Sequence, residues 1–299
     1  MKTLEAISQN RVSIVGKLLD KSFATGTTTK GQPYERANIT VRVTQTYGGK
    51  EEVSEVPVSM FATHYTNAGT VNPAYKSIQD LKEMHSAQEV GFEMADTIRL
   101  TGASIQENYF KSKTTGQMIF GWQIRGSFVS AGAAKVKDTA SFTVDMFIRR
   151  MDREIDKDGI ETNRLRINGA IVQYGGKVDV IDFIVENPES IDYLERNWQP
   201  GNTVTAQGRI RATVVEAVSC KSSSWGEDVP MDSTSSVREL IITTGDDNPK
   251  EEEFAYDPAE ITKGLKRREA DIEQMRLKST NTAATANAKP TAARYEWQG

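Results

Sequence analysis

Cationic side chains stand beside aromatic rings at several places in the sequence. Cations can follow a phosphate backbone while rings stack on unpaired bases, which is the chemistry of single-stranded nucleic-acid binding. Three segments combine the two residue types, and their candidate binding residues are Tyr47 with Lys50, Tyr174 with Lys177, and Tyr109, Phe110, Lys111 and Lys113. The alternatives are tyrosines that fold back over their own hairpins and, for the third segment, an ordinary exposed turn.

Alternation of polar and apolar residues predicts further cations on the outer faces of strands. Where residues such as Ile39 and Ile167 point into a core, their neighbours along the strand must point outwards. This parity selects Arg42, Arg164, Arg166, Arg209 and Arg211. Each of them alone also fits a solvated surface arginine, but their positions on comparable strands favour a shared role.

The remaining candidates lie in loops or near strand ends. A first loop, expected over residues 20–36, carries cations among Thr and Gly and would become ordered over a bound strand. Trp122 shares a face with Phe120 and Ile124, so a place in the barrel core is an alternative to stacking, whereas Trp225 is expected in a Ser-rich loop. The candidates of this group are Lys17, Lys30, Arg36, Trp122, Arg125 and Trp225.

Catalytic and metal-binding arrangements are not supported by the sequence. The histidines are His64 and His85, and no cysteine lies near either, so zinc sites and His–Cys catalysis lack their residues. No Gly-x-Ser-x-Gly elbow occurs. Residues 26–31 lack the spacing of a phosphate loop, and residues 156–161 lack the ligand pattern of a calcium loop. We therefore predict a protein that is not an enzyme and that needs neither metal nor cofactor.

Composition indicates a globular chain. The 299 residues are 37% hydrophobic and 26% charged, and this length predicts about two domains. No long apolar run and no secretory leader is apparent, and a single cysteine fits a reducing compartment, so we expect a cytoplasmic protein without membrane contact. The net charge of −4 argues against a uniformly basic binder but allows a local basic groove.

The same order of predicted elements occurs twice. Alternating strands, a Tyr-Gly-Gly-Lys turn, a partner strand, a helix and a strand that ends in Gly fill residues 11–102 and again residues 142–208. Many short strands with one helix are typical of the five-stranded oligonucleotide-binding (OB) barrel. We predict a mainly β chain with OB domains at 1–134 and 135–245. Residues 246–299 are expected to form an acidic linker, a helix to about residue 278 and a disordered tail.

Two short segments resemble the bacterial and phage single-stranded-DNA-binding proteins. Residues 10–18 are similar to the opening strand of that family, and residues 201–210 are similar to its fourth strand. The arrangement of two domains resembles phage binders with tandem OB folds. Bacterial members have one domain per chain and an acidic, apolar tip, whereas residues 295–299 here read Tyr-Glu-Trp-Gln-Gly.

The resemblance implies a protein that coats single-stranded DNA without strong sequence preference during phage DNA replication or recombination, in the host cytoplasm. Two aromatic residues in the tail, Tyr295 and Trp297, suggest a short docking motif for replication or recombination proteins, and the alternative is an unstructured end without a role. Two alternatives stay open. The acidic pI of about 5.5 favours a protein-interaction module built on OB barrels. An RNA-binding protein is equally compatible, since stacking does not detect a 2′-hydroxyl.

Overall fold

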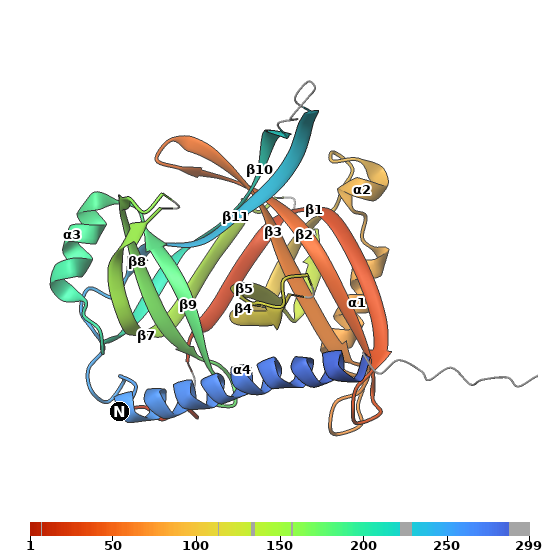
Figure 1. Cartoon of the computed structure of the whole chain (residues 1–299). Helices are drawn as coiled ribbons and strands as arrows, with labels where there is room; N and C mark the ends of the chain where they lie inside the picture. The colour runs from red at the N-terminus through yellow and green to blue at the C-terminus, as the bar shows by residue number, and fades with distance from the viewer. Residues whose placement is uncertain (7, 113, 133–134, 157, 222–228, 287–299) are drawn as a thin grey trace, which may run out of the picture.

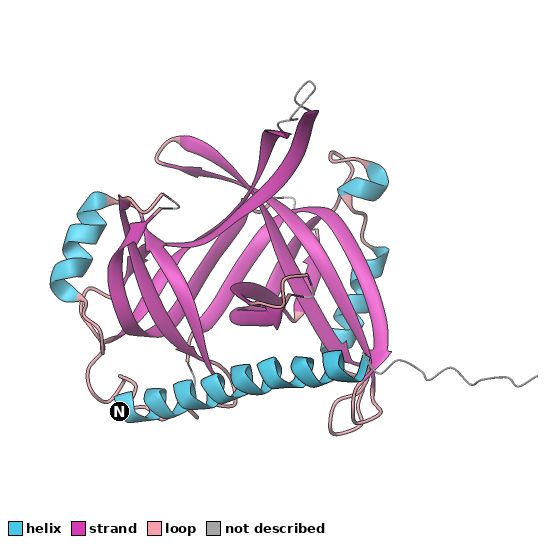
Figure 2. Ribbon diagram, viewed as in Figure 1, coloured by secondary structure: helices cyan, strands magenta, loops and turns pink. Residues whose placement is uncertain are grey.

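The computed structural model describes residues 1–299 except 7, 113, 133–134, 157, 222–228 and 287–299, and it describes the backbone alone at 214–221, 229–235 and 278–286. Strands form most of the described chain, and helices lie at its periphery (Figure 2). The mainly β class predicted from the sequence is therefore confirmed. In this described part of the chain, no helix combines the length and the apolar composition needed to cross a bilayer.

The first part of the chain closes a five-stranded barrel. Its elements are β1 (Asn10–Thr27), β2 (Pro33–Tyr47), β3 (Lys50–Thr63), α1 (Pro73–Glu83), α2 (Ala87–Val90), β4 (Thr97–Lys111), β5 (Met118–Gly126) and the short β6 (Phe128–Ala131). The ladder runs β1–β2–β3, continues in parallel from β3 to β5, and returns through β4 to β1. Closure of this kind leaves no unpaired strand edge inside the barrel wall.

The second part repeats the same order of pairings. Its elements are β7 (Thr139–Ile155), β8 (Glu161–Val172), β9 (Val178–Val185), α3 (Pro188–Asn197), β10 (Thr203–Lys221) and β11 (Val229–Gly245). The ladder runs β7–β8–β9, continues in parallel from β9 to β11, and returns through β10 to β7. Beyond this second barrel, β10 and β11 continue as a two-stranded arm (Figure 1).

One β ladder joins the two barrels. Residues Asn10 to Val15 of β1 pair with β7 in antiparallel fashion, while the overlapping stretch Val12 to Lys17 pairs with β4. A single cluster of buried side chains therefore extends from Val12 in the first barrel to Val144 and Phe142 in the second. The barrels share a core as well as a sheet.

The two helices that cover the barrel ends follow the predicted pattern. α1 begins at Pro73, where the Asn72 side chain accepts a 3.0 Å hydrogen bond from the N–H of Ala74. α3 begins in the same way at Pro188 after Asn187. Asparagine at the cap and proline in the first turn are a strong helix-start signal. Each helix turns one apolar stripe inwards, and Trp198 at the end of α3 is buried.

Two segments expected to be loops are strands. Residues 20–27 and 33–36 extend the β1–β2 hairpin, so only residues 28–32 form its turn. The Thr-rich composition that suggested a loop also suits strands, because β-branched residues fit a pleated sheet. The aromatic segment 108–111 likewise lies in β4, and only residues 112–117 connect it to β5.

The acidic segment after β11, which we predicted as a linker, packs against the second barrel. Trp198 Nε1 donates a 3.1 Å hydrogen bond to the backbone oxygen of Asp246. The N–H of Tyr256 donates to Thr203 Oγ1 at 2.9 Å, and the Tyr256 side chain is buried. The N–H of Lys2 donates to the oxygen of Ala255 at 2.7 Å. These contacts fix the position at which the last helix starts.

The last helix, α4 (Pro258–Ala286), lies across both barrels (Figure 1). It continues past the predicted end near residue 278 into residues that we had assigned to a disordered tail. Its own residues Ile261 and Ile272 are buried against the barrels, and Gly264 allows close contact with Val178 of β9. Arg268 forms an ion pair with the buried Glu107 of β4. The helix is therefore an integral part of the folded body.

Candidate nucleic-acid interface

The outer face of the first barrel carries a groove of about 310 Å³. Polar side chains of β1, β2, β3 and β5 form its floor, because their neighbours along each strand point into the core. These floor residues are Ser22, Asn38, Thr40, Ser59 and Gln123. Trp122 of β5 and Arg238 of β11 also line the groove, so both barrels contribute to this surface.

Trp122 and Arg238 form a stacked pair in this groove. The guanidinium carbon of Arg238 lies 4.4 Å from the centre of the Trp122 ring, and Nη2 donates a 3.1 Å hydrogen bond to the backbone oxygen of Trp122. Burial lowers the pKa of Arg238. Trp122 is half-buried: part of its ring packs against the core, and part faces the groove, where it is accessible for stacking.

A second group of rings and cations continues the same face along β2 and β3. The rings of Tyr34 and Phe61 lie 5.0 Å apart, and the guanidinium carbon of Arg36 lies 5.5 and 5.6 Å from their centres. Arg36 is directly opposite Phe61 in the strand register, two residues before the groove residue Asn38. This packing holds a cation between two aromatic faces on a rigid sheet.

Arg125 and Arg42 complete the cations of this face. Arg125 of β5 is opposite Ser59 of β3. Burial, together with the positive charge of Arg36, lowers the pKa of Arg125. The guanidinium carbon of Arg42 lies 5.1 Å from the ring centre of Phe92, and Arg42 points outwards as strand parity predicted.

Four arginines lie in the groove or on the strands around it, and we call them the groove arginines: Arg36, Arg42, Arg125 and Arg238. Among the described residues none of them forms an ion pair, and in the partly buried Arg42, Arg125 and Arg238 the buried Nε has no hydrogen-bond partner. Asp20 is the acidic residue among those that line the groove. Burying cations without carboxylates is costly. A bound anion would remove that cost.

The lysines proposed near this face divide into two groups. Lys17 donates through Nζ to the backbone oxygens of Glu93 at 3.2 Å and Ala95 at 2.7 Å, so it holds the segment before β4 in place. The prediction that Lys17 binds nucleic acid is therefore wrong, because its ammonium is already occupied by these two hydrogen bonds. Lys30 and Lys50 are exposed at the turns of the β1–β2 and β2–β3 hairpins.

The equivalent face of the second barrel has its cations paired with carboxylates. Arg164 and Arg166 point outwards as predicted, but Glu154 lies 3.2 Å from Arg164 Nη1 and 3.0 Å from Arg166 Nη2. Arg164 also forms a 2.5 Å ion pair with Glu239. Strand parity was right, and the expectation of available cations was wrong, because parity does not reveal the charge on the neighbouring strand.

Arg209 and Arg211 lie between the barrels and not on a free face. Arg209 is 8% exposed and contacts Glu52 of β3 at 2.6 Å and Glu186 at 2.9 Å. Arg211 contacts the same two carboxylates at 3.0 and 2.7 Å; its burial alone would lower its pKa, but Glu186 and Glu52 outweigh burial and raise it. The ring centre of Tyr47 lies 4.2 Å from the Arg209 guanidinium carbon. Tyr47, Arg209 and Arg211 therefore join the barrels, which corrects their assignment as nucleic-acid contacts.

The β4–β5 hairpin carries exposed aromatic rings. Phe110 is 47% exposed and Phe120 is 49% exposed, while the rings of Tyr109 and Phe120 lie 6.3 Å apart. The core alternative for Phe120 is wrong, because β5 pairs with β3 only from Ile124 onwards and leaves the barrel wall before that point. Lys111 is partly buried on the same hairpin. These rings extend the candidate interface beyond the groove.

The second Tyr-Gly-Gly-Lys turn separates its tyrosine from its lysine. Both turns have the predicted glycines at positive φ, Gly48 and Gly49 in one and Gly175 and Gly176 in the other. Tyr174 is fully exposed, whereas Lys177 lies 2.8 Å from the buried Asp179 and 5.6 Å from the ring centre of Tyr109. The expected pair of Tyr174 with Lys177 does not form, because the carboxylate of Asp179, two residues further along β9, binds the Lys177 ammonium.

Two candidates, Lys113 and Trp225, lie outside the described residues. Tyr34, Phe61 and Arg238 also lie on this face and were not among the residues predicted from the sequence. Strand parity could have found the first two, because they share the outward phase of Arg36 and Ser59 once residues 33–36 are recognised as strand. No local pattern could have found Arg238, since it reaches Trp122 from the other barrel.

Among the described residues, no cluster of three His, Cys, Asp or Glu side chains could hold a metal.

Comparisons with solved structures return low sequence identities. The wild-type single-stranded DNA binding protein from Thermus aquaticus aligns over 82% of this chain and 95% of its own, with 12% identity and a TM-score of 0.47. A deletion mutant of that protein aligns over 82% and 96%, with 13% identity and a TM-score of 0.46. A small single-stranded DNA-binding protein from Streptomyces coelicolor aligns over 43% and 99%, with 10% identity and a TM-score of 0.27.

Comparison with curated proteins returns no match. A protein-family model described as YorF matches residues 8–278. This match spans both barrels and most of α4, and it shows that the chain belongs to the YorF family.

Proposed function

We propose that the protein binds single-stranded DNA on the outer face of the first barrel. The observation that carries this proposal is the set of groove arginines, none of which has a carboxylate partner among the described residues. Arg42, Arg125 and Arg238 are partly buried, and Arg36 is exposed against the rings of Tyr34 and Phe61. Phosphates would supply the missing charge, and bases would stack on the rings. We further propose that both barrels are OB folds, in which the face of strands 2 and 3 is the usual binding surface.

The biological role that we propose is to coat single strands without strong sequence preference during phage replication or recombination. The resemblance of residues 10–18 and 201–210 to single-strand binders supports this role. The groove offers stacking rings and guanidinium groups, which tolerate any base sequence. We propose binding without catalysis, in the cytoplasm of the host.

The test is fluorescence anisotropy of labelled oligo(dT) titrated with the wild-type protein and with a Trp122→Ala variant. We expect the variant to lose about 1–3 kcal/mol of binding free energy, the usual contribution of one base–aromatic stack. If all four groove arginines contact phosphates, log K should fall with log salt at a slope near −2.8, from about −0.7 per contact. The Arg36→Ala variant should lower that slope by about 0.7.

Arg166→Ala is the matched control, since this arginine is paired with Glu154 on the second barrel. It should change neither the affinity nor the salt slope. Duplex DNA should compete weakly, and oligo(rU) as competitor separates DNA from RNA preference. The proposal fails if wild-type protein does not bind oligo(dT) at tens of micromolar in low salt, or if Arg36→Ala and Arg166→Ala behave alike.

A further inference from the structure

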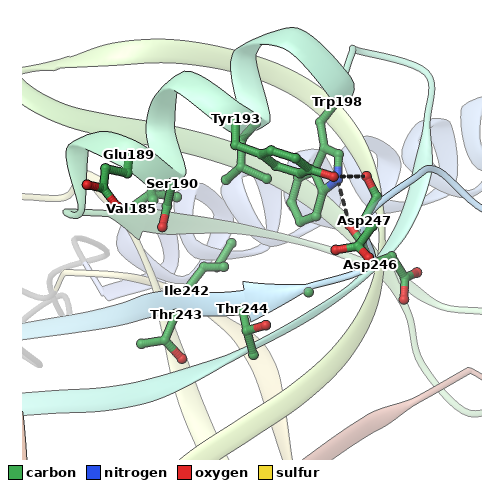
Figure 3. Close-up of a pocket in the computed structure, with 12 residues that line it drawn as sticks. Val185, Glu189, Ser190, Tyr193, Trp198, Ile242, Thr243, Thr244, Asp246 and Asp247 are labelled. Carbon is green, nitrogen blue, oxygen red and sulfur yellow. Dashed lines mark hydrogen bonds between the residues drawn. The ribbon is translucent and has the colours of Figure 1, made fainter.

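A cleft of about 270 Å³ lies between α3 and β11 (Figure 3), and it shares no lining residue with the groove of the first barrel. Its apolar lining includes Val185, Leu194 and Ile242. The rings of Tyr193 and Trp198 stand side by side at one end, where their polar atoms donate to the backbone oxygens of residues 247 and 246 at 3.0 and 3.1 Å. Because those polar atoms are already bonded, the cleft offers mainly apolar surface to a ligand.

The charged residues that line this cleft are all acidic: Glu189, Asp246 and Asp247. Asp246 accepts a 2.7 Å hydrogen bond from the N–H of Thr205 and lies 3.9 Å from Lys250 Nζ. No lysine or arginine is among the described lining residues. A polyanion such as DNA would be repelled here, whereas a cationic segment with an apolar side chain is complementary in both charge and surface.

The chain itself contains such a segment outside the described residues. Residues 287–299 carry Lys289 and Arg294 against the single acid Glu296, and they include the aromatic residues Tyr295 and Trp297. A ring beside a cation matches an apolar cleft with an acidic rim.

The same chain cannot place this segment in its own cleft. α4 has 29 residues and is therefore about 43 Å long. It begins below the second barrel, near α3, and runs towards the first barrel (Figure 1). From its last residue, Ala286, to Trp297 there are eleven residues, which span at most about 40 Å when fully extended. The segment is too short to run back along the whole helix and then reach α3.

We propose that the cleft between α3 and β11 binds residues 294–297 of a second copy of the chain. The aromatic rings pack against the exposed ring of Tyr193 and the apolar floor of the cleft, and the Arg294 guanidinium pairs with the carboxylates of the rim. This contact is heterologous, with the segment of one copy in the cleft of the next, so it does not close and can add further copies. If the proposed DNA binding holds, successive copies would contact one another along a strand.

Sedimentation velocity on full-length protein without DNA tests the proposal independently of any DNA binding. The tail variant combines Arg294→Glu with Trp297→Ala, and the cleft variant combines Glu189→Lys with Asp247→Lys. A matched control carries the same charge change at Glu83→Lys and Asp271→Lys, which are exposed on α1 and α4. Circular dichroism checks that every variant is folded, and Asp247→Asn provides a milder second cleft variant.

Wild type and control should associate with increasing concentration up to about 100 μM, as expected of a small interface. Each variant alone should sediment as a monomer, and Asp247→Asn should associate several-fold more weakly than wild type. A mixture of tail and cleft variants should form only one-to-one pairs, because each supplies one intact half of the contact. Three results would overturn the proposal. The wild-type protein could stay monomeric, the tail or the cleft variant could associate as strongly as wild type, or the mixture of the two variants could stay monomeric.

Discussion

Replacing Arg209 by alanine separates two roles for this residue, a nucleic-acid contact or a contact between the barrels. Its guanidinium lies 2.6 Å from a Glu52 oxygen and 2.9 Å from a Glu186 oxygen, and it packs over the Tyr47 ring. Glu52 belongs to the first barrel, while Glu186 follows β9 in the second. The substitution therefore removes a cation from between two carboxylates that come from different barrels.

The expected cost follows from burial. Removing one partner of a buried ion pair costs about 3–5 kcal/mol, because the remaining charge stays out of water. Arg211 contacts both Glu52 and Glu186 and partly compensates their charge, which places the expected loss near the lower limit, about 3 kcal/mol. The matched control is Arg166→Ala. The Arg166 side chain is 39% exposed and lies 3.0 Å from Glu154, so its loss should cost about 0–1 kcal/mol.

Urea unfolding followed by tryptophan fluorescence measures both losses, and oligo(dT) anisotropy measures binding for the same proteins. We expect Arg209→Ala to unfold at clearly lower urea concentration than Arg166→Ala. Once both are folded at low urea, their affinity for oligo(dT) should match wild type. Unchanged stability together with weakened binding by Arg209→Ala would refute the reasoning, since that is the behaviour of an exposed phosphate contact.

Three further predictions concern α4, the segment before it, and their contacts. Burial raises the pKa of Tyr256 from 10.0 to about 12, so the neutral phenol favours the folded state. The stabilisation of the folded state by the neutral phenol is complete below pH 10 and is lost as the pH rises to 12. Between these two pH values the free energy of unfolding of the wild type should therefore fall by about 2–3 kcal/mol more than that of Tyr256→Phe, as measured by urea unfolding at both pH values. A Cβ on Gly264 would lie 2.2 Å from Val178 Cγ2, so Gly264→Ala should lower the thermal stability by about 1–3 kcal/mol despite alanine's higher helix propensity; unchanged amide exchange in α4 would contradict this packing. Arg268→Ala should cost about 3–5 kcal/mol because it leaves the Glu107 carboxylate buried, and Glu107→Gln in the same protein should recover part of the loss, whereas equal stability of single and double variants would exclude the ion pair as the cause.

Local sequence patterns predicted the barrel walls because they depend on local geometry. Ile39, Val41 and Val43 are all buried, as their alternation requires. The Gly-Gly pairs adopt the positive φ that makes glycine favourable in hairpin turns. These features involve only neighbouring residues, so one sequence is enough to predict them.

The sequence could not predict what covers each outward face. Arg209 has the outward phase that was expected, since Ile210 beside it is buried. The face onto which it points is covered by the β2–β3 hairpin of the other barrel, and that contact joins Arg209 to Glu52, more than 150 residues away. Alternation tells a core side chain from an outward one, but the tertiary contact decides whether an outward side chain meets water, a carboxylate or a ligand.

The two barrels therefore differ mainly in what their outward arginines contact, and less in how many such arginines they carry. On the second barrel, Arg164 and Arg166 are held by Glu154 and Glu239, so a phosphate could bind only by displacing carboxylates that are already in place. On the first barrel, Arg36 and Arg125 lie close enough for one charge to lower the pKa of the other. Folding places these like charges together, and their repulsion lowers the stability of the free protein. A ligand that carries phosphates would neutralise the charges and remove this repulsion. Under the proposed function Arg125→Met should raise the stability of the free protein while weakening its binding to oligo(dT). Paired measurements of unfolding and anisotropy would show opposite signs for this variant, and a loss of both would mean that the arginine serves the fold.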